Sequence, residues 1–312
     1  MRTAIATAPA TVANVGPGFD VLGLCLEEPR DRVRAELTAD GRVELVAVEG
    51  DGGRLSRVAA ENCAGVAAQA VLERFGAAGS GVRLWLDKGL PLGSGLGSSA
   101  ASAVAAALAT ARLVCPEVPK EALLDACREG ERLATGSPHP DNVAPSLLGG
   151  LVACLPGAGE AVEVVRLALP AGLHVVCVKP DVEVRTADAR RVMPAAIPVA
   201  DVVRTLAAMA GLVTALASGD LELAGRCLDD RVATPYRRAL IPGYDAVMEA
   251  LLRAGAVGGG ISGSGPTVFA LAGDRECARR AADAMVEAFA TAGHAAMALV
   301  SAVDPSGARL EP

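Results

Sequence analysis

The chain has 312 residues, of which 52% are hydrophobic and 21% are charged. This balance is typical of a folded globular protein and excludes an intrinsically disordered chain. The net charge of −7 disfavours nucleic acid as a partner, because nucleic-acid-binding proteins more often carry a basic face. No run of about 18 apolar residues is free of charge, proline and glycine, so the sequence predicts no membrane span.

Eight cysteines are scattered along the chain without a CxxC pair or a histidine at zinc-ligand spacing. In a chain of this length, the pattern favours buried, reduced thiols over disulfides or a zinc site. The N-terminal segment lacks a strong apolar stretch, so no signal peptide is expected. We therefore expect a cytoplasmic protein of about two domains.

Hydrophobic periodicity predicts alternating strands and helices in the first half of the chain. The strands are expected over 3–11, 33–37, 43–48, 81–87 and 151–155, and the helices over 56–75, 100–114 and 119–135. The turn Ala39-Asp40-Gly41 separates the second and third strands and is typical of a hairpin. The last of these helices is expected to bury Leu123, Leu124, Cys127 and Leu133.

The second half is predicted to begin with two strands and to end in a β-β-α-β arrangement. Strands are expected over 162–167, 173–179, 256–261, 267–271 and 294–300, and helices over 187–192, 201–217, 220–226, 244–253 and 276–292. The composition changes little along the chain, so a domain boundary is best placed at the Gly/Pro turn 156–159. This divides the chain into residues 1–156 and 157–312.

The most specific motif is a glycine-rich stretch, residues 91–101, with the sequence PLGSGLGSSAA. Alternating glycines allow close backbone approach, and the helix predicted after them presents free N–H groups and a positive dipole end to an anion. Ser98 and Ser99 add hydroxyls that suit helix capping, phosphate or Mg²⁺. The stretch lacks the lysine of a Walker A loop and the spacing of a Rossmann fingerprint. A flexible Gly/Ser turn before a capped helix is the alternative interpretation.

These residues resemble the second motif of the GHMP kinases (galactokinase, homoserine kinase, mevalonate kinase and phosphomevalonate kinase). Residues 8–20 resemble the first motif of that family and residues 258–267 the third. The resemblance implies an α+β fold of two domains, with an N-terminal domain like ribosomal protein S5 domain 2 and a ferredoxin-like C-terminal domain. It also implies ATP in the cleft between them, bound by Pro91, Leu92, Gly93, Ser94, Gly95, Leu96, Gly97, Ser98, Ser99, Ala100 and Ala101.

Residues 14–23, 136–150 and 234–243 resemble the homoserine kinase branch in particular. That resemblance implies transfer of the ATP γ-phosphate to the hydroxyl of an amino-acid-like alcohol such as L-homoserine. The implied substrate-binding residues are Asn14, Asp20, His139, Asp141, Arg190 and Arg237. Arginine suits the substrate carboxylate and aspartate its ammonium. From sequence alone, solvated arginines, turn-forming Asn14 and Asp20, and a loop histidine remain open alternatives.

The resemblance further implies that Ser99 and Glu131 bind Mg²⁺ and that Asn142 and Thr186 act at the reacting hydroxyl. No strong base is expected, because a loose transition state needs little covalent help and the phosphate itself can accept the proton. Asn142 has an alternative role as a helix N-cap, and Glu131 as an exposed helix carboxylate. A homodimer fits the family, although no interface can be recognised. The rival functions are a mevalonate-pathway kinase, a non-catalytic metabolite sensor on the same fold, and an α+β domain that binds no nucleotide.

Overall fold

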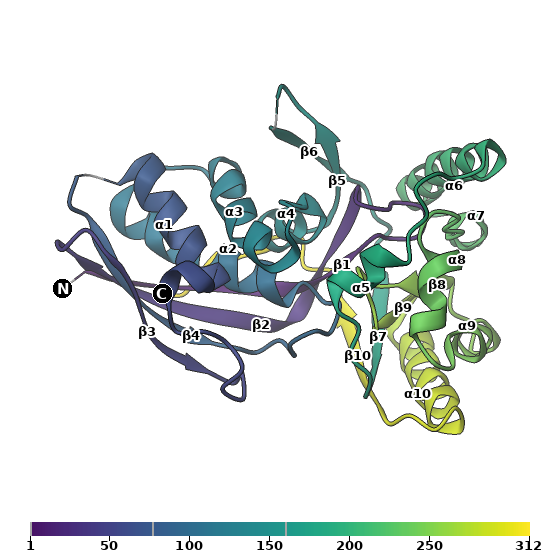
Figure 1. The fold of residues 1–312 in the computed structure, drawn as a ribbon. Coiled ribbons are helices and arrows are strands. Elements are labelled where there is room, and N and C mark those ends of the chain that lie inside the picture. Colours follow the sequence, from purple (N-terminus) through teal and green to yellow (C-terminus); the bar gives the residue numbers. More distant parts are fainter. Residues whose placement is uncertain (1, 77, 160) are drawn as a thin grey trace.

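The computed structural model describes residues 2–76, 78–159 and 161–312. The chain forms two lobes, each built on a sheet covered by helices (Figure 1). The first lobe contains β1 (Thr3–Ala13), β2 (Leu22–Thr38), β3 (Val43–Glu49), η1 (Ala59–Glu61), α1 (Cys63–Phe75), β4 (Gly81–Asp87), α2 (Ser98–Val114), η2 (Lys120–Leu123), α3 (Leu124–Thr135), α4 (Pro140–Leu148), β5 (Leu151–Pro156), β6 (Val162–Leu167) and β11 (Arg309–Leu310). The second lobe contains β7 (His174–Pro180), α5 (Thr186–Arg191), α6 (Val199–Ser218), α7 (Leu221–Cys227), α8 (Thr234–Arg237), η3 (Arg238–Leu240), α9 (Tyr244–Arg253), β8 (Gly258–Ile261), β9 (Val268–Ala272), α10 (Arg275–Thr291) and β10 (Ala296–Ala302).

The first sheet has the strand order β11-β1-β2-β4-β3, with β5 also paired to β2 and β6 paired to β5. The hairpin predicted around Asp40 is wrong, because β4 lies between β2 and β3 and pairs with β3 in parallel. In β4, Val82, Leu84 and Leu86 are all buried, which suits an interior strand. The turn signal was correct as a turn, but it carries no information on which strands become neighbours.

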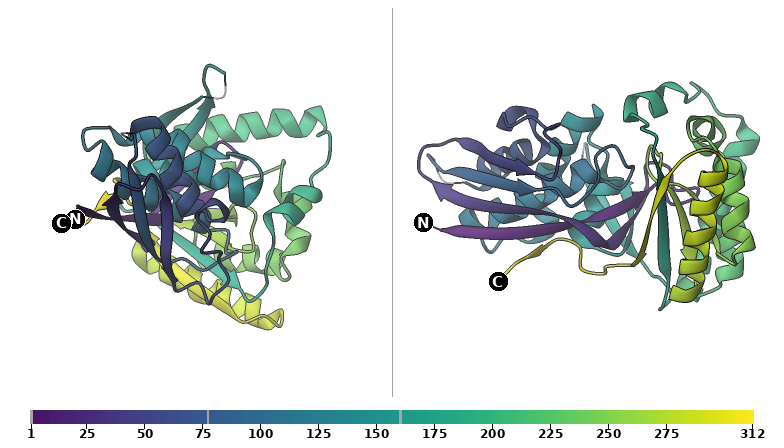
Figure 2. Two further views of the ribbon diagram at one scale, coloured as in Figure 1. Left: turned by 60° about the vertical axis from the view of Figure 1, so that its left-hand side comes forward. Right: turned by 90° about the horizontal axis from the view of Figure 1, so that it is seen from below.

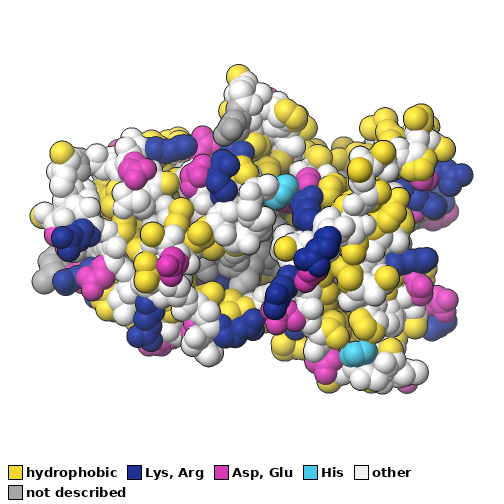
Figure 3. All heavy atoms as spheres, viewed as in Figure 1, with side chains coloured by type: hydrophobic (Ala, Val, Ile, Leu, Met, Phe, Trp, Pro, Cys, Tyr) yellow, Lys and Arg dark blue, Asp and Glu magenta, His cyan; other side chains and the backbone are white. Residues whose placement is uncertain are grey.

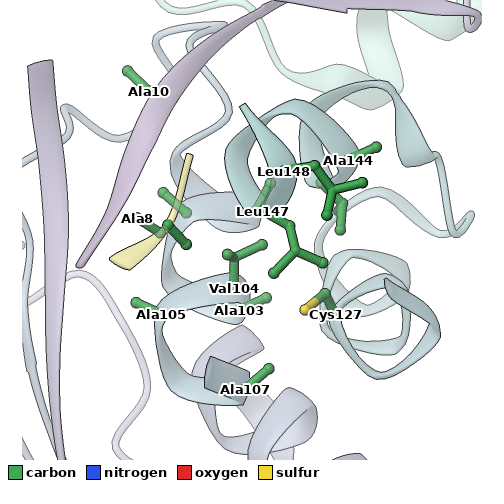
Figure 4. Close-up of a cluster of buried hydrophobic side chains, with 14 of the residues drawn as sticks. Ala8, Ala10, Ala103, Val104, Ala105, Ala107, Cys127, Ala144, Leu147 and Leu148 are labelled. Carbon is green, nitrogen blue, oxygen red and sulfur yellow. The ribbon is translucent and has the colours of Figure 1, made fainter. Parts of the chain in front are cut away.

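The core of the first lobe is built mainly from alanine around α2, which is buried along almost its whole length. Ala8 of β1, Ala103 and Ala107 of α2, and Leu147 of α4 converge in one cluster (Figure 4). Small side chains let the helices and the sheet approach closely, so the interior is filled without large rings. This explains how a chain with 2% aromatic residues forms a packed core.

The helix boundaries follow local capping. The helix predicted over 56–75 begins at Cys63, because the Asn62 side chain accepts a hydrogen bond from the Ala64 amide at 3.0 Å. α4 was not predicted, since prolines stand at its first position and in its interior. Leu133, expected to be buried in α3, is exposed.

The second sheet has the antiparallel order β10-β7-β9-β8. Alternate residues of β7 serve two cores: Val175 and Cys177 belong to the large core shared with α6, and Val176 and Val178 pack with α9 and α10. The two faces of this sheet therefore pack into different cores, with α9 and α10 against one of them. The β-β-α-β ending predicted from the sequence is present as β8, β9, α10 and β10.

The chain leaves the first sheet later than the sequence suggested. β6 pairs with β5 over residues 151–167, and the second sheet begins with β7. The boundary predicted at Pro156 therefore falls inside the β5–β6 pair, and the change of sheet lies between Leu167 and His174. The chain end then returns to the first lobe, where β11 pairs with β1 (Figure 2).

One helix of the described residues, α6, is long and apolar enough to cross a membrane by length and composition alone. Its buried face, with Leu212, Ala215 and Leu216, belongs to the large core. Asp201 and Arg204 lie on its first turns. We therefore interpret α6 as a surface helix of this fold, with an apolar outer face at Val199, Val202, Val203 and Leu206.

Candidate active site

A cavity of about 370 Å³ opens between the two lobes. Its walls come from the glycine-rich stretch, from α1, α3 and α4 of the first lobe, and from the segment 183–190, Arg237 and Gly263 of the second. Figure 3 shows basic side chains and a histidine gathered along the edge of the hollow between the lobes. Of the predicted site residues, Pro91, Leu96, Ala100 and Ala101 do not line it.

The glycine-rich stretch wraps the N-terminus of α2. Gly93, Gly95 and Gly97 have φ values of 61°, 77° and 69°, in the left-handed region that glycine adopts most readily. A Cβ on Gly97 would stand 2.1 Å from Thr11 Oγ1, so no side chain fits there. Because first-turn amides have no partner within their helix, the turn presents donors and a positive dipole end to the cavity. This geometry suits a phosphate group.

The second lobe fixes the loop from outside. The Ser262 hydroxyl donates to the Gly95 carbonyl at 2.6 Å, and the Thr267 hydroxyl donates to the Ser94 carbonyl at 2.6 Å. Ser262 and Thr267 are fully buried and belong to the third predicted motif. The third motif thus holds the second motif in place.

A buried ion pair that the sequence did not reveal lies beneath the loop. Lys88 Nζ contacts the Asp31 carboxylate and donates to the Ser98 carbonyl at 2.8 Å and to the Ser102 hydroxyl at 2.9 Å. The other Asp31 oxygen accepts from the amides of Gly89 and Leu90 at 3.0 and 3.1 Å. Asp31 therefore links the residues before the loop, Gly89 and Leu90, to Ser102 in the helix that follows it. Isolated charges in or beside a strand give no periodic signal. The one local hint is that Lys88 stands three residues before the glycine-rich stretch.

Ser99 and Glu131 lie together as expected, with the Ser99 hydroxyl donating to Glu131 Oε2 at 2.7 Å. Burial raises the pKa of Glu131 to about 7; the Ser99 hydrogen bond lowers it and the charge of Asp141 raises it. A buried carboxylate of this kind gains from a nearby cation. No cluster of three or more acidic, histidine or cysteine side chains suited to a metal occurs in the described part of the chain. Mg²⁺ does not require one, since it takes few protein ligands and completes its shell with phosphate and water.

Another part of the cavity wall carries an ion pair. Arg190 binds Asp20 in bidentate fashion, with nitrogen–oxygen distances of 2.9 and 2.7 Å. Arg190 also lies 3.0 Å from Nε2 of His139, whose pKa burial lowers. The neighbouring Arg191 instead pairs with Asp188 at the surface. The structure therefore shows that Arg190 lines the cavity and that Arg191 does not, which the sequence could not decide.

Backbone geometry holds the acidic side of this pair. Asn14 and Asp20 both have positive φ values, 58° and 57°. The Asn14 amide donates to the Gly263 carbonyl at 2.9 Å and its oxygen accepts from the Asp20 amide at 2.9 Å. The turn interpretation of these residues thus holds alongside their place in the site.

Arg237 is almost completely buried and donates to the carbonyls of Ala189 and Gly263 at 3.1 and 2.9 Å. Its guanidinium and that of Arg190 each lie 5.1 Å from the centre of the Phe19 ring. This cation–π arrangement places two positive groups around one aromatic ring. Two guanidiniums in one cavity suit an anionic group such as a carboxylate.

The remaining predicted residues also line the cavity. Burial raises the pKa of Asp141 to about 7, and the charge of Asp20 adds to that effect. Asn142 lies inside α4, whose N-cap is His139, and its side-chain oxygen accepts from the Thr11 hydroxyl at 2.7 Å. Thr186 begins α5 at the cavity wall. Among the lining residues that sequence reasoning missed are Arg54, Lys88, Glu183 and Arg185.

Comparison with known proteins identifies the family of the chain. Residues 62–150 match the model of the GHMP kinases N terminal domain, and residues 212–291 match that of the GHMP kinases C terminal. The chain is 44% identical to a homoserine kinase of Pyrococcus furiosus over 290 residues, covering 92% of this chain and 93% of that one.

Solved structures show the same likeness. A crystal structure of homoserine kinase from Cytophaga hutchinsonii is 40% identical, covers 100% of this chain and 98% of its own, and has a TM-score of 0.94. A mevalonate kinase of L. major in complex with R-mevalonate, 18% identical over 95% of both chains with a TM-score of 0.69, shares the fold. The expected two-domain α+β fold is thereby confirmed. The chain belongs to the homoserine kinase branch of the GHMP kinase family.

Proposed function

We propose that the chain transfers the γ-phosphate of ATP to the hydroxyl of L-homoserine, giving O-phospho-L-homoserine and ADP as a step in threonine biosynthesis. The observation that carries this proposal is the Asp20–Arg190 pair beside the glycine-rich loop. A zwitterion presents one carboxylate and one ammonium. The carboxylate can take the place of Asp20 at Arg190, and the ammonium can take the place of Arg190 at Asp20. Arg190 and Arg237 then bind the carboxylate, and Asp20 and Asp141 the ammonium.

The two halves of the cavity divide the work. The loop amides and the N-terminus of α2 hold the triphosphate, and Asn142 and Thr186 orient the hydroxyl. Ser99 and Glu131 are the residues that would hold Mg²⁺, which supplies charge neutralisation at the phosphates when bound. No side chain is required as a strong base, since positioning and electrostatics provide most of the acceleration.

The rival functions fit the site less well. Mevalonate has no ammonium, so the Asp20 carboxylate would lack a partner once a substrate carboxylate displaced it from Arg190. A non-catalytic sensor has no need for the Ser99–Glu131 pair, which is intact here. The homodimer expected from the resemblance stays a prediction, which sedimentation of the purified chain checks. A cytoplasmic location is also proposed, supported by eight cysteines that are all free thiols.

The test is turnover by the purified protein with Mg-ATP and a panel of acceptors: L-homoserine, L-serine, L-threonine and mevalonate. We expect ADP release and O-phosphohomoserine formation with L-homoserine at the highest kcat/KM of the panel. The matched control is the Ser99→Ala variant, which keeps the acceptor side and should lose turnover. Mevalonate as the preferred acceptor, or no turnover with any of them, contradicts the proposal.

A further inference from the structure

Arg185 lines the cavity, but it belongs to none of the three motifs and has no role in the proposed mechanism. The other basic side chains of the cavity are already engaged. Arg54 pairs with Glu183, Lys88 with Asp31, Arg190 with Asp20, and Arg237 with two backbone carbonyls. The side chain of Arg185 makes no hydrogen bond or ion pair with any residue that the structure describes, and the residue is exposed.

The segment that carries Arg185 runs from the phosphate side of the cavity to the acceptor side. At one end, a Cβ added to Gly93 would meet Glu183 Oε1 at 3.5 Å, so Glu183 lies against the glycine-rich loop. At the other end, Arg190 holds Asp20. Arg185 follows Glu183 by two residues, which is at most about 8 Å of chain. Its backbone therefore lies between the two halves of the site.

A group transferred between these halves passes through the cavity that Arg185 lines. In the proposed reaction, the bond from the γ-phosphorus to the bridging oxygen breaks and its electron pair leaves on ADP. A bond forms from the homoserine oxygen to the same phosphorus, and the hydroxyl proton passes to a phosphoryl oxygen. Negative charge is spread over the phosphoryl oxygens during this transfer, and a guanidinium can bind two of them at once.

We infer that Arg185 contacts the γ-phosphoryl group of ATP and stabilises it during transfer. This inference rests on the proposed function. The role of Arg185 is to bind negative charge, and no proton transfer is assigned to it. Glu183 pairs with Arg54 at 3.2 Å, so among the cavity residues that the structure describes, the guanidinium of Arg185 is left available to the nucleotide.

The first measurement is nucleotide affinity, which needs no acceptor. With Mg²⁺ present, Arg185→Ala should weaken a non-hydrolysable ATP analogue by about 10- to 100-fold, the loss of one charge-assisted contact. ADP, which has no γ-phosphate, should keep its affinity within about twofold. Arg191→Ala is the matched control, because Arg191 is a second exposed arginine nearby in the sequence and pairs with Asp188. Equal weakening of ADP and the analogue, or no weakening of either, overturns the inference.

The second measurement is turnover with L-homoserine. Arg185→Ala should lower kcat by about 100- to 1000-fold with little change in the KM for homoserine, and Arg185→Lys should recover part of the loss. Added guanidinium should restore some activity to Arg185→Ala and none to the control. A variant with wild-type kcat refutes the role of Arg185 while leaving the proposed function standing. The opposite outcome is also possible to distinguish. If Arg185→Ala weakens the ATP analogue but not ADP, and the wild-type protein does not phosphorylate homoserine, the proposed function is refuted and the role of Arg185 stands.

Discussion

The two halves of the cavity are built by different means. The half proposed to bind ATP, here the nucleotide half, is held by backbone conformation and by buried groups, of which Asp31, Ser262 and Thr267 are fully buried. In the half proposed to bind the acceptor, here the acceptor half, the Asp20–Arg190 ion pair is partly open to solvent, with 27% of the Asp20 side chain and 35% of the Arg190 side chain exposed. A cradle made of buried contacts is present before any ligand arrives, whereas charges that neutralise one another can exchange partners when a zwitterion enters.

The largest expected effect tests whether the nucleotide half is structural. Lys88→Met removes the cation beneath the loop and leaves Asp31 buried and unpaired, which should cost about 3–5 kcal/mol of unfolding free energy. Asp20→Asn, which breaks the half-exposed pair, should cost about 1 kcal/mol or less. Denaturant unfolding measures both. Similar losses for the two variants would contradict the distinction between the halves.

The next prediction concerns binding on the acceptor half. Arg190→Ala should lower kcat/KM for L-homoserine by about 100- to 1000-fold, the cost of a lost bidentate charge contact. The KM for Mg-ATP should change by no more than about twofold, because the loop does not depend on this arginine. Arg238→Ala, an exposed arginine paired with Asp245, is the control. If Arg190→Ala weakens Mg-ATP and L-homoserine equally, the two halves are coupled, and the proposed difference between them is wrong.

Glu131 gives a prediction on pH. Its folded pKa of about 7 lies above its ordinary 4.5, so the folded protein holds more protons than the unfolded chain between these values. The stability of the ligand-free protein should therefore fall as pH rises from about 4.5 through 7. Glu131→Gln should remove on the order of 2 kcal/mol of this loss. Thermal unfolding in EDTA across pH 5 to 8 measures it, with the exposed Glu129→Gln as control. A pH profile unchanged by Glu131→Gln contradicts the raised pKa.

The smallest effect probes the contact between lobes. Thr267→Val keeps the shape of the side chain but removes the hydrogen bond to the Ser94 carbonyl. An unpaired buried carbonyl should cost about 1–2 kcal/mol, visible as weaker Mg-ATP binding and lower unfolding free energy. The KM for homoserine should stay near that of the wild type. If the KM for homoserine rises instead and Mg-ATP binding is unchanged, Thr267 belongs to the acceptor half.

The same contrast explains what the sequence revealed. The glycine-rich loop is a local motif whose conformation follows from adjacent residues, so its place at the start of α2 was predictable. The acceptor residues come from segments far apart, and only the family resemblance joined Asp20 to Arg190 before the structure did. Asp31 and Lys88 escaped notice because a buried charge has no signature without its partner. The pairing of β3 with β4 was missed for a similar reason, since it is decided by packing across the sheet.

The return of the chain to its first strand has a consequence for how the protein folds during its synthesis on the ribosome. β1 receives β11 as its edge partner, and the segment between Asp304 and Ala308 bonds to Arg30 and Ser146 of the first lobe. At 5–20 residues per second, a ribosome needs roughly 15–60 s to reach this segment after making β1. During that interval Ala6 and Thr7, at the outer edge of β1, lack the strand with which they pair. Nascent chains halted before residue 300 should therefore bind chaperones that recognise bare strand edges, and release them once residues 303–312 emerge.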